Sequence, residues 1–499
     1  MESTSPDTRR VVLACLAVFA ASVAVRVITA EYIDIGGDNA TRWAFAKALT
    51  LGADLPAWNN HTMRWPIVLP LWALMEAFGA NPALYYVLPV LMASIGAVLA
   101  YLVGLQLGGT GAGWFAAGLA VLFPQMTQTG SQLWPSVFQF TFVLGSVLCI
   151  NAWHERRGNA DSHRMTDWLL VAASVLYFLA WGSRLSGMYF FPGLLLLVWL
   201  PSRSWRALFL FCLPSAVLLV AEWAVFYQIT GSALGRLGVV QGQTTGIPSV
   251  PLADYLLNIA KLTKLKGLLP VLALTLAASV ALLRDADARV RALAWLHLVF
   301  LLLFVYMVSS LDPIRLAQPT GSRYWCAGAP LGLVLLAVWL TRLRPRFPKT
   351  VLTVGAVLLL AFAGFSIKKI PAENAILQVA RDDAVLAPVL AQGERVALTW
   401  RAWQPNAAER LLFRALGIPA KERRTPKRHL DMAMLRAADR IVMVYGPPGM
   451  DADFGLERLA RVDEDTYVFT PPGARPDAPI RASVHFDRKT ARAEPRATP

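Results

Sequence analysis

Residues 11–30 read VVLACLAVFAASVAVRVITA, an apolar run that begins directly after the basic residues Arg9 and Arg10. A helix of about twenty residues spans the roughly 30 Å hydrocarbon core of a bilayer, so this stretch is long enough to cross a membrane. It lacks a convincing small-x-small cleavage site at its end, which favours a retained first helix over a removed signal peptide. The fold of the remaining chain follows from the repetition of such runs.

The composition of the whole chain is typical of a membrane protein. Of the 499 residues, 56% are hydrophobic and only 16% are charged, which is outside the range of ordinary soluble domains. The net charge of +15 comes from Lys and Arg in short loops and in the C-terminal tail. No nucleic-acid-binding motif accompanies this charge, so we expect membrane lipids and not nucleic acid as its partner. The four cysteines lie in apolar runs and predict neither a disulfide framework nor a metal site.

The apolar runs predict eleven membrane-spanning helices, with boundaries that are soft by several residues. The expected spans are about 11–30, 83–107, 111–127, 131–153, 168–182, 186–200, 207–229, 267–283, 292–310, 326–340 and 350–366. The shorter ones are marginal alone and are expected to pack inside a bundle. The predicted fold is therefore an all-α polytopic membrane bundle.

The charge of the connections predicts the orientation of this bundle. Four connections after even-numbered spans are short and rich in arginine: HERRGNADSHRMTD, PSRSWR, RDADARVR and TRLRPRFPK. Because Lys and Arg near span ends favour the cytoplasmic side, residues 1–10 form a cytoplasmic N-terminal tail. With eleven spans the C-terminal tail lies outside. We expect an integral protein of the bacterial inner (plasma) membrane whose active face is turned to the periplasm or exterior.

Two long external loops, 31–82 and 230–266, interrupt the membrane module of 11–370. The first contains two surface-helix patterns, DNATRWAFAKALTLG and, after Pro66, IVLPLWALMEAFG. The second loop is first Gly-rich and then amphipathic and basic, as in LADYLLNIAKLTKLKG. Loops of this length are usually functional or disordered.

The residues after the last span predict a separate domain. Strand-like segments (RVALTW, RIVMVYG and LARVDEDTYVFTPP) alternate with helix-like ones (NAAERLLFRALG and HLDMAMLRAADR). This alternation predicts a small external α/β domain over 371–473. The composition of 474–499 turns to Pro, Ala, Arg and Asp, which predicts disorder.

Ionisable residues gather at the expected external ends of the spans. Asp38 opens a helix-like stretch, where it is either a plain N-cap or a functional carboxylate. Asp34 crowds the same turn, and Arg42 follows Asp38 by one helical turn. Such neighbours can hold a carboxylate ionised and oriented as a general base.

Further candidates lie in the same external connections. Glu222, in LLVAEWAVFYQ, is the one carboxylate well inside a predicted span and marks either a site or a buried pair. The remaining candidates are basic or aromatic: His61 and Arg64 in the first loop, Arg184 in the tight hairpin WGSRLSGMYFFPG, and Arg323 and Tyr324 in GSRYW. Such residues are either interface anchors or ligands, because a guanidinium can bind phosphate through two hydrogen bonds.

The order and sidedness of these motifs resemble the GT-C glycosyltransferases. The narrower likeness, over about 10–370, is to the family-39-like branch of the protein O-mannosyltransferases and the bacterial lipid A aminoarabinose transferases. It is carried by the acidic GGDNATRW, by RWPIVLPLWALMEAFG before the second span and by the late Arg-Tyr pair. The resemblance implies a polyprenyl-phosphate sugar donor from the outer leaflet, Asp38 as catalytic carboxylate, and Arg323 and Tyr324 near the donor phosphate.

One departure from that branch concerns metal binding. Its members often have an acid at the start of the fourth span, where this chain has GSQLWPSVFQF, with Gln132 or Trp134 at the place of the acid. A divalent metal ion therefore has no clear ligand set in the sequence.

The residues themselves fit an inverting single displacement. A polyprenyl phosphate is a good leaving group, so one base, Asp38, and one or two phosphate-binding arginines are sufficient. The expected phosphate clamp is Arg323 with Arg184 or Arg64, and the acceptor is a lipid, a glycan or a protein. Two alternatives remain: a transporter or lipid flippase, although no internal repeat is visible, and an assembly protein whose tail binds a partner.

Overall fold

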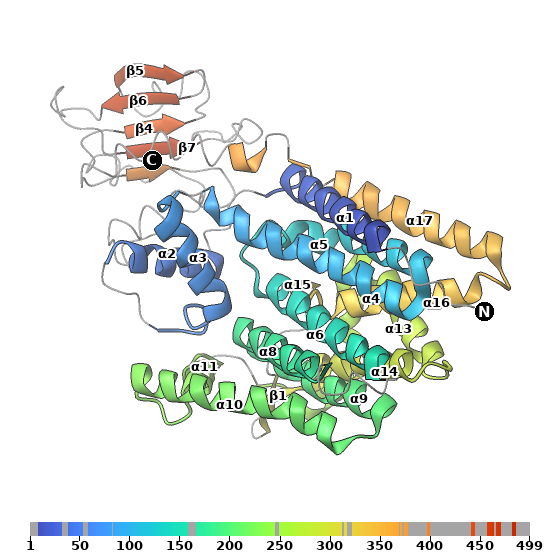
Figure 1. Ribbon diagram of the computed structural model, residues 1–499. Helices are drawn as coiled ribbons and strands as arrows, with labels where there is room; N and C mark the ends of the chain where they lie inside the picture. The colour runs from blue at the N-terminus through green and yellow to red at the C-terminus, as the bar shows by residue number, and fades with distance from the viewer. Residues whose placement is uncertain are drawn as a thin grey trace. The chain divides into compact units, whose positions relative to one another are not determined.

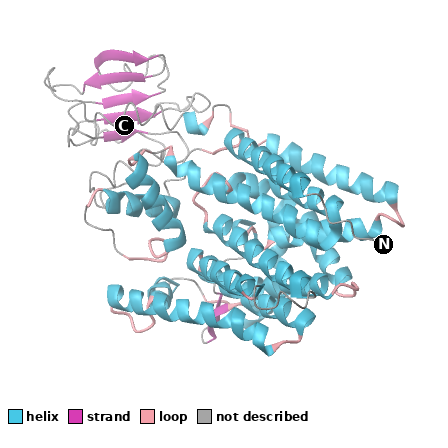
Figure 2. Ribbon diagram, viewed as in Figure 1, coloured by secondary structure: helices cyan, strands magenta, loops and turns pink. Residues whose placement is uncertain are grey.

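The computed structural model describes residues 8–31, 38–52, 58–81, 83–157, 166–244, 249–311, 314–316, 322–368, 370–371 and 374–377, and five strands beyond them. Most of this chain is helical (Figure 2). It divides into two compact units. The first unit comprises residues 1–30, 56–73 and 86–372, and the second comprises 31–55, 74–85 and 373–499.

Seven helical segments of the described chain are long and apolar enough to cross a membrane. They are α1 (Thr8–Ile28), α4 (Leu84–Leu122), α6 (Pro135–Arg157), η2 with α9 (Leu185–Phe190 and Phe191–Ser202), α10 (Trp205–Thr230), α14 (Ala288–Tyr306) and α17 (Pro348–Ile367). Shorter apolar helices are α3 (Trp65–Phe78), α8 (Trp168–Ser183), α13 (Leu269–Leu282) and α16 (Ala329–Leu343). A polytopic helical membrane architecture is therefore confirmed.

The finer count of eleven spans stays a prediction. Helix α4 covers two of the predicted spans and bends at Gly109, whose φ of 77° is a backbone conformation that favours glycine. Helices α8, α13 and α16 coincide with three more, but they have only 16, 14 and 15 residues. At about 1.5 Å per residue they are shorter than the roughly 30 Å hydrocarbon core.

The helices of the first unit differ in what they pack against. Helix α16 is buried along most of its length, through residues such as Leu335 and Val338. In contrast, α10 and α17 lie on the outside of the unit (Figure 1) and expose large apolar side chains, among them Val220 and Leu360. Lipid is the solvent that makes such exposure favourable.

Small residues bring interior helices into close contact. Gly193 of α9 faces α14, and a Cβ atom at this position would lie 2.6 Å from the Cα atom of Leu296. The backbones of α9 and α14 can approach this closely only because Gly193 has no side chain, which is the usual role of small residues between membrane helices.

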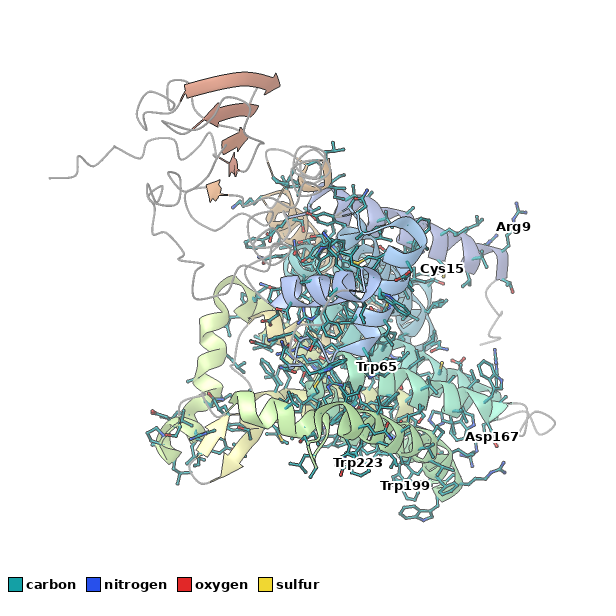
Figure 3. All side chains as sticks on the ribbon, turned by 90° about the vertical axis from the view of Figure 1, so that its left-hand side faces the viewer. Arg9, Cys15, Trp65, Asp167, Trp199 and Trp223 are labelled. Carbon is teal, nitrogen blue, oxygen red and sulfur yellow. The ribbon has the colours of Figure 1, made fainter. Side chains whose placement is uncertain are left out.

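Three ion pairs join the arginine-rich connections at one end of the first unit. Asp167 pairs with Arg206 at 2.6 Å, Glu155 with Arg289 at 2.8 Å, and Asp285 with Arg342 at 3.3 Å. The six residues belong to the ends of α6, α13 and α16 and the beginnings of α8, α10 and α14. All four arginine-rich connections therefore meet at the same end of the helices, and Asp167 lies on the same side of the unit as Arg9 (Figure 3).

Short elements follow the opposite ends of α10 and α14. The loop after α10 contains α11 (Arg236–Thr244), α12 (Leu252–Leu256) and the 3-10 helix η3 (Leu257–Leu268). After α14, the antiparallel strands β1 (Val308–Leu311) and β2 (Ile314–Leu316) precede α15 (Ser322–Trp325). The other described short helix, α5 (Pro124–Thr129), lies between α4 and α6.

The second unit contains helix α2 (Asp38–Thr50), as predicted for the first loop, and a five-stranded sheet. Within this unit Trp43 of α2 is buried and contacts Tyr85 edge to face, with 5.9 Å between ring centroids. The strands are β3 (Ala397–Thr399), β4 (Ile441–Val444), β5 (Glu457–Asp463), β6 (Thr466–Thr470) and β7 (Ala482–His485), in the order β3-β7-β4-β6-β5. β7 pairs in parallel with β3 and β4, whereas β6 is antiparallel to β4 and β5.

The sheet corrects one sequence-based expectation and leaves another open. Strand β7 lies within 474–499, which was expected to be a disordered tail. The expectation was based on the average composition of 474–499. It did not take into account the alternation of Ile480, Ala482, Val484 and Phe486, which is a strand pattern inside a polar, Pro-rich segment. The two helix-like segments of the predicted α/β domain lie outside the described residues.

Candidate functional site

The structure brings together two of the predicted site residues that are far apart in the sequence. Arg184 follows the last residue of α8, and Tyr324 lies in α15, directly before the buried α16. The guanidinium carbon of Arg184 lies 4.1 Å from the centroid of the Tyr324 ring. This distance is that of a cation–π contact, in which the ring attracts and positions the guanidinium.

The backbone around Arg184 is also held in place. Its N–H donates to the carbonyl oxygens of Ala180 and Trp181 at 3.3 and 3.1 Å, which ends helix α8. Gln139 of α6 donates from Nε2 to the Arg184 carbonyl oxygen at 3.3 Å. The contact with the ring places the positive charge of the guanidinium over the ring face. A guanidinium is a side-chain group that can bind a phosphate through two parallel hydrogen bonds.

Glu222 in the second half of α10 is the centre of a buried hydrogen-bond cluster. Its Oε1 accepts from Trp65 Nε1 at 2.8 Å and from Arg236 Nη1 at 3.0 Å, and its Oε2 accepts from Trp181 Nε1 at 2.7 Å. The side chains of Glu222 and Arg236 are only 8% and 3% exposed. Of the two interpretations that the sequence leaves open, the observed contacts are those of a buried pair.

Arg236 is a residue that the sequence analysis did not single out. It is the first residue of α11, in the Gly-rich part of the loop after α10, where the sequence pattern predicts a solvent-exposed arginine. Burial lowers the pKa of the Arg236 guanidinium, and the charge of Glu222 opposes this effect. Its Nε and Nη2 atoms have no hydrogen-bond partner among the described residues. The one signal in the sequence for a buried cation is Glu222, the carboxylate inside the preceding apolar run.

His61 and Arg64 precede helix α3 in the first unit. Arg64 is buried and donates from Nε to the Asn60 carbonyl oxygen at 3.0 Å. The backbone N–H of half-buried His61 donates to Asn59 Oδ1 at 2.7 Å. Because Trp65 directly follows Arg64, the Glu222 cluster fixes the chain next to this arginine.

Asp38 and Arg42 belong to the second unit. Asp38 is the first residue of α2 and is half-buried, a position in which a carboxylate interacts favourably with the helix dipole. Arg42 is fully buried and donates from Nη1 to Asn39 Oδ1 at 2.7 Å. Asp34 and the side chain of Arg323 lie outside the described residues.

Two other polar side chains have structural roles. Arg26 at the end of α1 is buried and donates to the carbonyl oxygens of Val121 and Ala120 at 2.8 and 3.0 Å. These are among the last carbonyls of α4, so Arg26 caps the C-terminal end of that helix. His297 is buried in α14, with Nδ1 2.8 Å from Ser279 Oγ. Across the part of the chain that the structure describes, no group of three or more His, Cys, Asp or Glu side chains could hold a metal ion.

The comparisons with known proteins are with solved structures, because no protein-family model and no curated protein matches the chain. ArnT from Cupriavidus metallidurans bound to undecaprenyl phosphate is 14% identical, with a TM-score of 0.58 over 93% of this chain and 99% of that chain. ArnT in the apo state is 15% identical, with a TM-score of 0.57 and coverages of 92% and 97%. The archaeal oligosaccharyltransferase AglB from Archaeoglobus fulgidus, in complex with an inhibitory peptide and a dolichol-phosphate, has a TM-score of 0.44 at 13% identity, over 83% of this chain and 60% of that chain.

The similarity to ArnT shows the fold. The chain is an integral membrane protein whose fold is like that of ArnT, a lipid A aminoarabinose transferase. The resemblance found in the sequence motifs is therefore confirmed at the level of the fold.

Proposed function

We propose that this chain is a membrane glycosyltransferase that moves a sugar from a polyprenyl-phosphate donor to a lipid, glycan or protein acceptor. The observation that carries the proposal is the ArnT fold, which extends over nearly the full length of both chains. One of the two ArnT structures is bound to undecaprenyl phosphate. A lipid of this class is the carrier expected for the donor of the present chain.

The reaction needs two contributions from the protein, a cation that binds the donor phosphate and a base that accepts a proton. Arg184, oriented by the ring of Tyr324, binds the phosphate of the donor and steadies the charge that develops on it as the bond to the sugar breaks. Arg323 and Arg64 are the further candidates for this clamp. Asp38 accepts the proton of the acceptor hydroxyl or amine, which attacks the anomeric carbon on the face opposite the departing phosphate. A single displacement of this kind inverts the anomeric centre.

The expected topology places this chemistry on the outer face. In the eleven-span arrangement the N-terminus is inside, the C-terminal domain is outside, and the active face is turned to the periplasm of a bacterial inner membrane. The meeting of the four arginine-rich connections at one end of the helices supports this orientation, because the positive-inside rule makes that end cytoplasmic. Arg184 and Tyr324 lie in connections that follow odd-numbered spans and therefore belong to the other end.

Transfer by the purified full-length protein tests the proposal. Polyprenyl-phosphate sugars with radiolabelled pentose or hexose are supplied together with a membrane extract as the source of acceptors, and the label that leaves the prenyl carrier is measured. Wild-type protein should transfer label, and Arg184→Ala should reduce the transfer at least tenfold. Arg206→Ala is the matched control, because Arg206 is an exposed arginine in a connection predicted to be cytoplasmic. Equal transfer by both variants would exclude the role of Arg184.

Binding of the carrier separates the enzyme from a transporter. Native mass spectrometry of the gently extracted protein should detect a prenyl phosphate, and added undecaprenyl phosphate should raise the thermal midpoint of the wild type more than that of Arg184→Ala. Movement of the lipid across proteoliposome membranes without sugar transfer would favour a flippase instead.

A further inference from the structure

The segment 252–259 in the loop after α10 has an anchored part and an exposed, mostly apolar part. The exposed residues are Leu252, Leu256, Leu257 and Ile259, which are 61%, 59%, 64% and 55% exposed, together with Ala253 and Asp254. In the anchored part, Tyr255 is half-buried and Asn258 is fully buried. The segment is therefore amphipathic in three dimensions and not only in its sequence pattern.

The anchored part holds the segment to the end of α14. Tyr255 donates from its hydroxyl to the Tyr306 carbonyl oxygen at 2.8 Å, and the Tyr306 hydroxyl donates back to the Leu256 carbonyl oxygen at 3.2 Å. The two rings meet edge to face, with 5.7 Å between centroids. Asn258 adds a hydrogen bond from Nδ2 to the Val305 carbonyl oxygen. These contacts satisfy backbone carbonyls in the last turn of α14 and fix the segment there.

The segment is held at the last turn of α14, so the position of this turn in the membrane sets how deep the segment lies. Helix α14 is one of the seven helices able to cross a membrane, and its first turn carries Arg289, which pairs with Glu155 at the opposite end of the unit. The segment also continues through η3 directly into α13, which begins at Leu269. One side of the segment is thus held at the last turn of a membrane helix, and its chain enters the first turn of another. Both constraints place it at the level of the lipid headgroups.

We infer that residues 252–268 form an interfacial membrane-binding segment, in which Leu252, Leu256, Leu257 and Ile259 insert between the lipid headgroups and the upper acyl chains. Exposed leucines and isoleucine at headgroup depth are stabilised by lipid, as in amphipathic interfacial helices. The lysines that follow in the sequence, Lys261, Lys264 and Lys266, favour a surface with anionic phospholipids. The inference depends on α14 crossing the membrane and is independent of the proposed sugar transfer.

Fluorescence quenching in nanodiscs tests the insertion. An environment-sensitive fluorescent amino acid replaces Leu257 in the full-length protein, so that the native cysteines stay unchanged. Doxyl-labelled phosphatidylcholine is the lipid quencher, and iodide is the aqueous quencher. Val220, which is 64% exposed in the middle part of α10, provides the lipid reference, and the free fluorophore in buffer provides the aqueous reference. The label at 257 should show about half or more of the lipid quenching seen at 220 and only a small part of the iodide quenching of the free fluorophore.

A second arm tests the preference for anionic lipid. Lipid quenching at 257 should increase when phosphatidylglycerol is included, and the increase should disappear in the variant Lys261→Gln/Lys264→Gln/Lys266→Gln. The same label at Leu252 repeats the measurement at a second exposed position, and each protein must keep the thermal midpoint of the wild type. Iodide quenching near that of the free fluorophore at both positions would overturn the inference, because the segment would then lie in water. Protection from both quenchers would also overturn it, because the exposed part would then be covered by protein. Equal quenching in both lipid mixtures would overturn the role of the lysines.

Discussion

Glu222 is predicted to be the polar side chain whose removal destabilises the helical unit most. It lies 8% exposed among three donors, at 2.8 Å from Trp65, 2.7 Å from Trp181 and 3.0 Å from Arg236. In Glu222→Gln the shape and one acceptor oxygen remain, but the charge of Arg236 is left buried without its counter-charge. Breaking a buried pair by removing one partner costs about 3–5 kcal/mol. Glu222→Ala should cost more, because each indole N–H that loses its acceptor adds about 1–3 kcal/mol.

A double-mutant cycle measures the pair itself. The single variants Glu222→Gln and Arg236→Gln and the double variant are compared by equilibrium unfolding in one detergent. Because the double variant contains no buried charge, it should be less destabilised than the sum of the two single variants, with a coupling of about 1–3 kcal/mol. The matched control is Asp167→Asn, which breaks an ion pair of 2.6 Å whose Arg206 partner is 69% exposed. Surface pairs of this kind contribute at most about 1 kcal/mol.

The cycle has a clear negative outcome. Additive effects of the two single changes would show that Glu222 and Arg236 are not coupled in the membrane-embedded protein. A loss for Glu222→Gln no larger than that for Asp167→Asn would show that water reaches the cluster. Either result would refute the description of Glu222 as a buried partner that holds α3, α8 and α11 together.

Three further outcomes are expected. Tyr324→Phe should keep donor binding near the wild-type level because the ring face under Arg184 remains, whereas Tyr324→Ala and Arg184→Lys should weaken binding of undecaprenyl phosphate about tenfold or more, measured by titration of the thermal midpoint. Asp38→Asn should lower kcat about 10²–10⁴-fold with an unchanged thermal midpoint, since a lost general base removes a contribution of this size; near-normal turnover would refute its role. Asp287 lies in the first unit, at the end where the arginine-rich connections meet. Partial burial raises the pKa of Asp287, but hydrogen bonds from Arg289 outweigh this effect and hold the pKa below its usual value. The ionised carboxylate of Asp287 therefore contributes fully to stability above the unfolded pKa of about 3.9. This contribution is lost as the pH falls through the folded pKa. The difference in thermal midpoint between wild type and Asp287→Asn should therefore shrink to zero in strong acid.

The positions of the helices were largely predictable because hydrophobicity along the chain is a local property. A run of apolar residues needs lipid or protein around it whatever its partners are, so the predicted spans coincide with helices. The bend at Gly109 likewise falls between the predicted spans 83–107 and 111–127. Strand β7 was missed because a short alternating segment has little weight against a polar, Pro-rich surrounding.

The partners of the polar side chains were not predictable in the same way. Arg184 and Tyr324 were both recognised as candidates, but nothing in a single sequence indicates that they contact each other across 139 intervening positions. Glu222 predicted a partner without identifying it. The partners are two tryptophans, a residue type that is ordinary in membrane proteins, and an arginine in a Gly-rich loop. Selection among many equivalent tryptophans and arginines requires the tertiary structure.

Arginines at both ends of the helical unit contact carboxylates and aromatic rings. At the predicted cytoplasmic end, Arg206, Arg289 and Arg342 contact carboxylates, and Arg157 lies 5.3 Å from the centroid of the Trp153 ring. At the opposite end, Arg236 pairs with Glu222, whereas Arg184 lies over the ring of Tyr324. A cation–π contact positions a guanidinium, and a positioned guanidinium is a group that can recognise a phosphate. The contact with Tyr324 therefore supports the proposal that Arg184, and not Arg236, binds the donor phosphate.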